Sequence, residues 1–199
     1  MLDLTSASQL TTLNYLLRQL EFQGGVFYLP PHYSNNGDLQ KTFLPELRNS
    51  DLPLPSQTKS EQALWMEIPS GLLLVPPGAE LASTFEKIFK KNFSNLKLQE
   101  LQRSLSKLLI GELEVAKSLE IVIEPNKIQV NLKNCIIKAP KFEFDLNSGA
   151  YSKFGSSLGS ALACIISKLT NKIVTIEKEQ NIRNGEDLFI EYSIISLGA

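Results

Sequence analysis

Hydrophobic and polar residues repeat along the chain with two periods, one typical of amphipathic helices and one of strands. Leucines three and four residues apart predict a helix over about 7–22, and Gly24 and Gly25 end it before a short apolar strand at 26–29. The same helical spacing recurs between 79 and 110, with an interruption at 92–95. We therefore expect two further helices in series, the second ending near Gly111.

Strand-like runs occur in pairs that flank short turn sequences. The predicted hairpins are 63–68 with 72–75, 119–124 with 127–132, and 172–178 with 187–195 turning through Asn184-Gly185. A helix over 151–169 joins the last two hairpins. The pattern predicts an α+β fold in one domain, 1–199, with a mainly antiparallel sheet of two or three hairpins covered by amphipathic helices.

A proline-rich segment interrupts this pattern at about 30–60. Its five prolines lie among Asn, Ser, Asp and Gln, which disfavours both helices and central strands. We expect a long loop there, either a partly ordered surface loop, a disordered segment, or a lid or partner-binding segment.

Composition and charge exclude several classes of partner. Hydrophobic residues make up 43% and charged residues 21%, and the formal net charge of −1 gives no one-signed field for nucleic acid. No apolar run reaches the roughly 18 residues of a membrane span, and the first twenty residues lack a secretory pattern. Two cysteines in a chain of this length do not form a disulfide framework, so we expect a cytoplasmic location.

Catalytic and metal-binding patterns are missing from the sequence. The single histidine, His32, is far in sequence from Cys135 and Cys164, and these three residues lack the short spacings of a zinc site. The acidic residues Glu177, Glu179, Glu186, Asp187 and Glu191 are expected mostly on the outer face of the last hairpin. We expect no catalytic residue, no metal site and no cofactor.

Small residues recur at i, i+4 and i+8 in the helix predicted at 151–169. We name Gly155, Gly159 and Ala163 the small-residue stripe. The stripe predicts either close packing on the sheet or on another helix, or space for a ligand or a symmetry mate. The candidate ligand-binding or interface residues are Phe85, Phe89, Phe154, Gly155, Leu158, Gly159, Leu162 and Ala163.

The last third of the chain resembles the small-molecule-binding domain named after vinyl reductases, a relative of the fold of vesicle-tethering TRAPP subunits. The resemblance covers about 112–199 and rests on the order hairpin, glycine-bearing helix, strand ending in Glu177, and turn at Gly185. Pro76-Pro77-Gly78 and the run Leu-Glu-Val-Ala-Lys-Ser-Leu-Glu-Ile at 113–121 are similar to uncharacterised archaeal proteins. Asn181 and Phe189 stand where the vinyl-reductase-type family commonly has cysteines.

Two functions from different classes remain open. The resemblance implies a non-enzymatic binding or sensor module in which the helices at 79–110 and 151–170 close an apolar pocket for a small molecule. The alternative is a homodimeric protein-interaction scaffold that uses the small-residue stripe or the proline-rich segment.

Overall fold

One antiparallel sheet organises the protein. The computed structural model describes residues 12, 15–17, 19–35, 40–59, 64–90, 92–135, 154–183 and 186–196. The sheet has eight strands in these residues, and all neighbouring strands run antiparallel. In spatial order they are β3 (Trp65–Glu67), β4 (Ser70–Leu74), β2 (Thr42–Pro45), β1 (Phe27–Tyr28), β7 (Ile173–Ile182), β8 (Asp187–Ile195), β6 (Lys127–Lys133) and β5 (Ser118–Glu124).

The α+β class is confirmed, and the description as two or three hairpins is wrong. The predicted hairpins form as β3–β4, β5–β6 and β7–β8, although the turn at Asn184-Gly185 lies outside the described residues. The strands β1 and β2 connect these hairpins, because β1 pairs with β7 and β2 pairs with β4. The result is a single continuous sheet.

The described part of the proline-rich segment, 30–35 and 40–59, contains regular elements, which corrects the expectation that its prolines exclude helices and central strands. It contains β2, the 3-10 helix η1 (Pro31–Tyr33) and the short helix α2 (Pro55–Thr58). Both short helices carry proline in their first turn, where the missing N–H costs nothing. Pro45 is the last residue of β2, so the prolines flank the strand instead of breaking it.

The helices agree with the predicted periodicity at most positions. The second and third predicted helices appear as α3 (Ala79–Phe89) and as a run of η3 (Leu98–Glu100), α4 (Leu101–Ser106) and the π-helical η4 (Lys107–Glu112), with η2 (Phe93–Asn95) between them. Of the first predicted helix, residues 12, 15–17 and 19 are helical, and the positions before residue 12 lie outside the described residues.

The last helix is shorter than predicted at its N-terminal end. It is α5 (Ser157–Thr170), and Ser156 caps it by accepting a hydrogen bond from the Gly159 N–H at 3.0 Å. Gly155 has a φ of +69°, a left-handed conformation that starts no helix. The predicted positions 151–153 lie outside the described residues.

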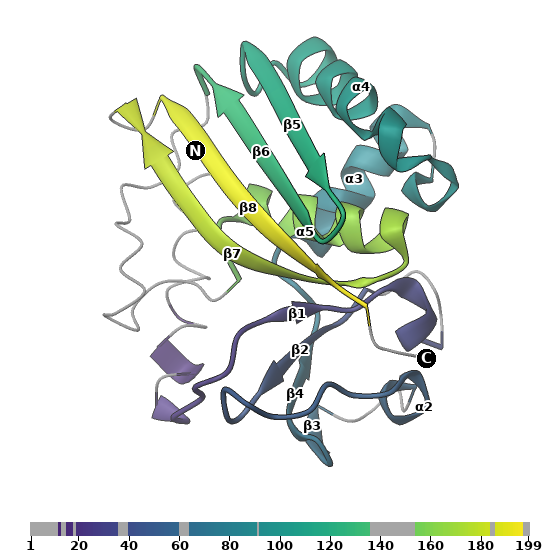
Figure 1. Ribbon diagram of the computed structural model, residues 1–199, viewed down its shortest axis with the longest axis vertical. Coiled ribbons are helices and arrows are strands. Elements are labelled where there is room, and N and C mark those ends of the chain that lie inside the picture. The colour runs from purple at the N-terminus through teal and green to yellow at the C-terminus, as the bar shows by residue number, and fades with distance from the viewer. Residues whose placement is uncertain are drawn as a thin grey trace.

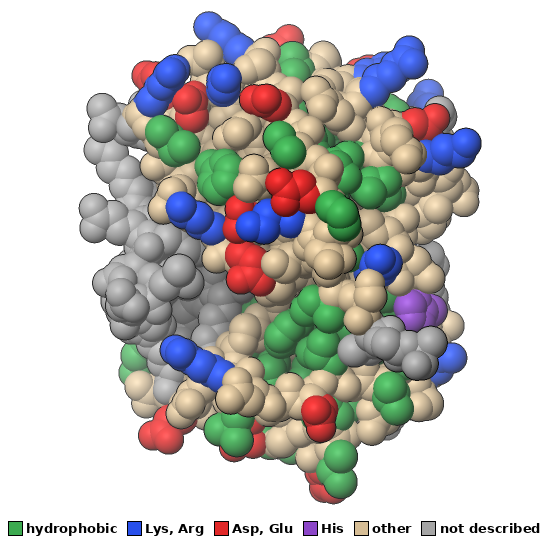
Figure 2. Space-filling model, viewed as in Figure 1, with side chains coloured by type: hydrophobic (Ala, Val, Ile, Leu, Met, Phe, Trp, Pro, Cys, Tyr) green, Lys and Arg blue, Asp and Glu red, His purple; other side chains and the backbone are tan. Residues whose placement is uncertain are grey.

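Helices α3, α4 and α5 cover one face of the half of the sheet formed by β5–β8 (Figure 1). The main hydrophobic core lies between these helices and the strands, and includes Phe85, Leu105, Phe154 and Ile190. A smaller cluster that includes Phe43, Met66 and Leu73 packs near β1–β4. The visible face shows acidic and basic side chains intermixed without one dominant sign (Figure 2).

Candidate functional site

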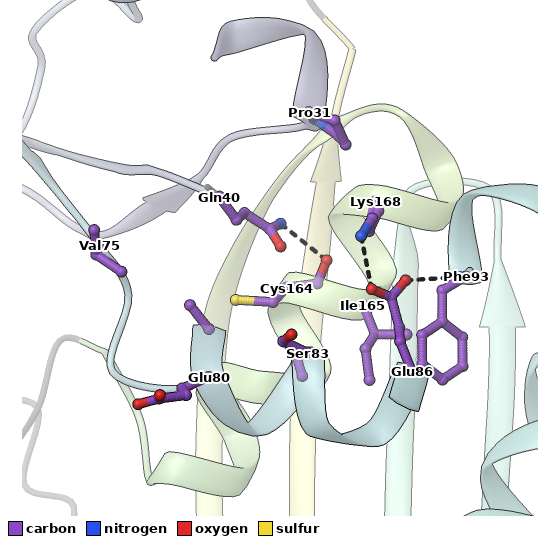
Figure 3. A pocket seen from close by; sticks show the side chains of 12 residues that line it. Pro31, Gln40, Val75, Glu80, Ser83, Glu86, Phe93, Cys164, Ile165 and Lys168 are labelled. Atoms are coloured by element: carbon purple, nitrogen blue, oxygen red, sulfur yellow. Dashed lines mark hydrogen bonds and ion pairs between the residues drawn. The ribbon is translucent and has the colours of Figure 1, made fainter. Parts of the chain in front are cut away.

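A cavity of about 390 Å³ lies between α3 and α5 (Figure 3). The rest of the wall comes from four other segments: Pro31 in η1, Gln40 before β2, Val75 after β4 and Phe93 in η2. The lining residues are Pro31, Gln40, Val75, Ala79, Glu80, Ala82, Ser83, Glu86, Phe93, Cys164, Ile165 and Lys168. Segments far apart in the sequence therefore build one hollow.

Gly78 fixes the distance between the two helices at one end of the cavity. A Cβ atom on Gly78 would lie 2.1 Å from the backbone nitrogen of Ala161, so only glycine allows this approach. The Gly78 N–H also donates a hydrogen bond of 2.9 Å to the buried Ser160 hydroxyl. The N-cap residue of α3 is thus held directly against the N-terminal part of α5.

An ion pair joins the same helices at the other end. The Lys168 ammonium lies 2.8 Å from Glu86 Oε2, and Glu86 Oε1 accepts a hydrogen bond of 2.9 Å from the Phe93 N–H. Both charged side chains are about four-fifths buried, with exposed fractions of 18% and 20%. This pair links α3, α5 and η2 at one point.

Small side chains on α3 leave the space between these two ends. Ala79, Ala82, Ser83 and Glu86 occupy positions i, i+3, i+4 and i+7, which places them on one face of the helix. Alanine and serine do not fill the distance to Cys164 and Ile165 on α5. The hollow follows from this choice of small residues, because larger ones would close it.

Gln40 closes the cavity on the side away from α3. Its Nε2 donates hydrogen bonds of 2.9 Å to the Cys164 carbonyl and 3.5 Å to the Leu29 carbonyl. The amide orientation follows from these contacts, since the amide oxygen cannot face two carbonyl oxygens. The Gln40 oxygen accordingly turns toward the cavity (Figure 3).

Cys164 contributes an unreactive thiol to this lining. The side chain is fully buried, and burial raises the pKa of the thiol far above its usual value. A protonated thiol is neither a nucleophile nor a metal ligand. Cys135, which is half-buried, also has a pKa raised by burial.

A second polar cluster surrounds Glu179, which is buried, whereas the expectation for most acidic residues of the last hairpin was its outer face. Glu179 on β7 is 2% exposed, and its Oε2 accepts a hydrogen bond of 2.9 Å from the Ser156 N–H. Burial raises the pKa of this carboxyl, although the hydrogen bonds from Ser156 oppose the shift. Asp187 is also buried, and its carboxylate accepts a hydrogen bond of 3.0 Å from the Asn134 N–H.

A β-bulge explains why Glu179 points inward. The register of β7 against β8 shifts between Ile176 and Lys178, so Glu177 is the extra residue. Val174 and Ile176 face the main core before the bulge, and Glu179 faces it afterwards. Strict alternation would have placed Glu179 on the opposite face.

Two buried tyrosines complete the cluster around the start of α5. The Tyr28 hydroxyl donates to the Phe154 carbonyl at 2.6 Å, and the Tyr192 hydroxyl donates to the Gly159 carbonyl at 3.0 Å. Burial is the main cause that raises the pKa of both hydroxyls. Together with the hydrogen bond to Glu179 on β7, these bonds hold the start of α5 to β1 and β8. The cluster therefore has a structural role.

The stability of the protein should depend on pH through Glu179. In the unfolded chain this carboxyl titrates near 4.5, and burial raises the pKa in the folded state, so the neutral form favours folding. The stabilisation from the neutral carboxyl is fully present below about pH 4.5 and is lost as the pH rises through the folded-state pKa. We expect the unfolding free energy of the wild type to fall relative to that of Glu179→Gln between pH 4.5 and pH 8. Urea unfolding at several pH values measures this difference, and a difference that stays constant with pH would contradict the raised pKa.

None of the eight predicted site residues is among the residues that line the cavity. Gly155 and Gly159 lie against Glu179, where a Cβ atom would come within 2.5 Å and 2.4 Å of the carboxylate. This is the close packing on the sheet that was one explanation of the small-residue stripe. Phe85, Phe154, Leu162 and Ala163 are buried in the main core, and Phe89 and Leu158 are partly buried. A ligand contact by any of the eight stays a prediction.

The described residues contain neither a metal-binding cluster nor a membrane-spanning helix. His32 is exposed, and its Nδ1 lies 2.9 Å from the side-chain oxygen of Asn171. Within the described ranges, no group of three or more His, Cys, Asp or Glu side chains could hold a metal ion. The helices of the same ranges include none with the length and apolar character of a membrane span.

Comparison with known proteins gives a family without a characterised function. No curated protein matches the chain significantly. One family model, described as a domain of unknown function (DUF7982), matches residues 5–192. This match extends over nearly the whole chain, and the protein therefore belongs to the DUF7982 family.

Proposed function

We propose that the protein is a non-enzymatic binding or sensor module that takes up a small molecule in the cavity between α3 and α5. The main support for this proposal is the cavity itself, whose volume of about 390 Å³ is within the range of known ligand sites. Its wall combines apolar side chains with a few polar groups, as such sites commonly do. The resemblance of residues 112–199 to vinyl-reductase-type domains and archaeal proteins supports this proposal and forms part of it.

The residues in the cavity wall favour binding over catalysis. Nucleophilic catalysis needs an activated nucleophile beside a base, and burial keeps the Cys164 thiol protonated. The Lys168 ammonium is held in an ion pair with Glu86. Neither group is prepared to attack a substrate.

A library of small metabolites tested by thermal unfolding addresses this proposal. A ligand at 100 times its Kd stabilises a protein by about 2.7 kcal/mol, which raises the Tm by roughly 5–10 °C at this chain length. Ser83→Trp should remove the shift, because Ser83 is exposed at the cavity and a large ring there fills it. Thr84→Trp is the matched control, since Thr84 is an exposed neighbour on α3 outside the lining.

Two results would contradict the proposal. The first is a set of ligands whose shifts persist unchanged in Ser83→Trp, because they bind elsewhere. The second is a library in which no compound stabilises the wild type.

A homodimer is the second candidate, favoured by the exposed edge of the sheet at β3. Strand β3 pairs with β4 on one side and with no described strand on the other. Large apolar side chains are exposed at this edge, with Trp65 at 46% and Ile68 at 79%. An apolar edge strand of this kind is suited to pairing with a second copy.

Light scattering after size exclusion tests this candidate. If β3 forms the interface, the wild type elutes as a dimer, and Ile68→Lys elutes as a folded monomer because a charge blocks the edge. A monomeric wild type, or a dimer that Ile68→Lys leaves intact, would contradict it.

A further inference from the structure

The chemistry of the cavity wall restricts the class of ligand, and this inference rests on the proposed function. The wall carries two carboxylates, Glu80 and Glu86, and one ammonium, Lys168, so it has one more negative than positive charge. Glu86 and Lys168 neutralise each other at 2.8 Å. The unbalanced charge is that of Glu80.

Glu80 lies at the opposite end of the cavity from this ion pair. Six residues separate Glu80 from Glu86 on α3, which corresponds to about 9 Å along the helix axis. The Glu80 side chain is exposed at the rim, and its carboxylate has no hydrogen-bond or ion-pair partner among the described residues. Among the lining residues at this end of the cavity, Glu80 supplies the negative charge, and its carboxylate points away from Gln40 (Figure 3).

The unused polar atoms of the wall are mainly acceptors. Both hydrogens of the Gln40 amide nitrogen point to the backbone carbonyls of Cys164 and Leu29, which leaves the amide oxygen as an acceptor on the cavity side. The Glu80 carboxylate accepts hydrogen bonds and cannot donate them when ionised. Ser83, on the α3 side, offers a hydroxyl that can do either (Figure 3).

Hydrogen-bond acceptors and a net negative charge complement a group that donates hydrogen bonds and carries a positive charge. We propose that the cavity binds a small amine, with its ammonium group directed to the Gln40 oxygen, its apolar body against Ala82, Phe93 and Ile165, and Glu80 as the negative charge at the rim. A carboxylate in the same place would face acceptors without donors and a charge of its own sign. The ligand class is therefore cationic and amphipathic.

Three probes of matched shape and different charge test this inference on the full chain. Cyclohexylmethylamine, cyclohexylmethanol and cyclohexanecarboxylate are positive, neutral and negative at pH 7, and NMR titration of the ¹⁵N-labelled protein gives a Kd for each. We expect the amine to bind roughly tenfold more tightly than the alcohol, as for hydrogen bonds to a charged group, and the carboxylate to bind most weakly. Resonances of α3 and α5 next to the cavity should shift.

Matched variants separate the role of Glu80 from a general effect of charge. Glu80→Gln should lower the affinity for the amine to that for the alcohol and leave the alcohol unchanged. Glu112→Gln removes an equal charge from an exposed residue outside the cavity lining and should change neither affinity.

The outcomes distinguish this inference from the proposed function. If the alcohol or the carboxylate binds as tightly as the amine, and Ser83→Trp abolishes that binding, the ligand class is wrong and the binding function stands. If the amine advantage survives in Glu80→Gln, the assignment of its ammonium group is wrong. If none of the probes shifts resonances at the cavity while a library compound stabilises the wild type and not Ser83→Trp, the ligand class is wrong and the binding function stands.

Discussion

Replacement of Gly78 by alanine should destabilise the protein by about 3 kcal/mol, at the upper end of the usual cost of overpacking. The added Cβ would lie 2.1 Å from Ala161 N and 2.5 Å from Ser160 C, and both are backbone atoms that cannot rotate away. The backbone of Gly78 has φ −88° and ψ 0°, which alanine adopts without strain. The expected loss therefore reports only the contact between α3 and α5.

Gly25→Ala is the matched control for this substitution. A Cβ atom on Gly25 would meet nothing within 4 Å, so we expect a change of less than about 1 kcal/mol, in either direction. Urea unfolding of both variants gives the comparison. Equal stability of Gly78→Ala and Gly25→Ala would show that α3 does not approach α5 as closely as described.

Gly159→Leu should destabilise the protein by about 1–3 kcal/mol, although leucine forms helices better than glycine. The Cβ atom would lie 2.4 Å from the Glu179 carboxylate oxygen and 3.0 Å from its carboxyl carbon. Glu179 is 2% exposed, so its side chain has no free space into which it could retreat. The leucine must displace a buried carboxyl from the helix start.

A double-mutant cycle tests whether Glu179 causes this cost. Gly159→Ala should be tolerated better when Glu179→Ala removes the opposing carboxyl, with a coupling of about 0.5–3 kcal/mol measured by urea unfolding. If Gly159→Leu stabilises the protein, or if the cycle shows no coupling, Glu179 does not lie against Gly159.

The predictable part of the fold depends on regular periodicity. The helix at 79–89 and the hairpin of β5 and β6 were predictable because their apolar positions repeat without interruption. The strand β2 is not predictable from proline content over the whole segment, because Pro31, Pro45 and Pro55 occupy element ends. Position within an element, which composition does not report, decides whether a proline breaks it.

The candidate site was less predictable than the fold. Alternation predicts an outer face for most acidic residues of the last hairpin, and one extra residue in β7 turns Glu179 inward without a sign in the sequence. The helices α3 and α5 lie together in the structure, but the shape of the cavity depends on Gly78 and on Gln40 from a distant segment. The spacing of Ala79, Ala82 and Ser83 on one face of α3 was the available signal.

The central claim is that the cavity between α3 and α5 holds a small molecule, and native mass spectrometry measures this most directly. Wild type, Ser83→Trp and Thr84→Trp are each incubated with a cell extract of small metabolites and transferred to volatile buffer. The account predicts an added mass of one small molecule per chain on the wild type and on Thr84→Trp, and the bare polypeptide mass for Ser83→Trp. Bare polypeptide masses for all three proteins, or the same added mass on Ser83→Trp, would contradict it.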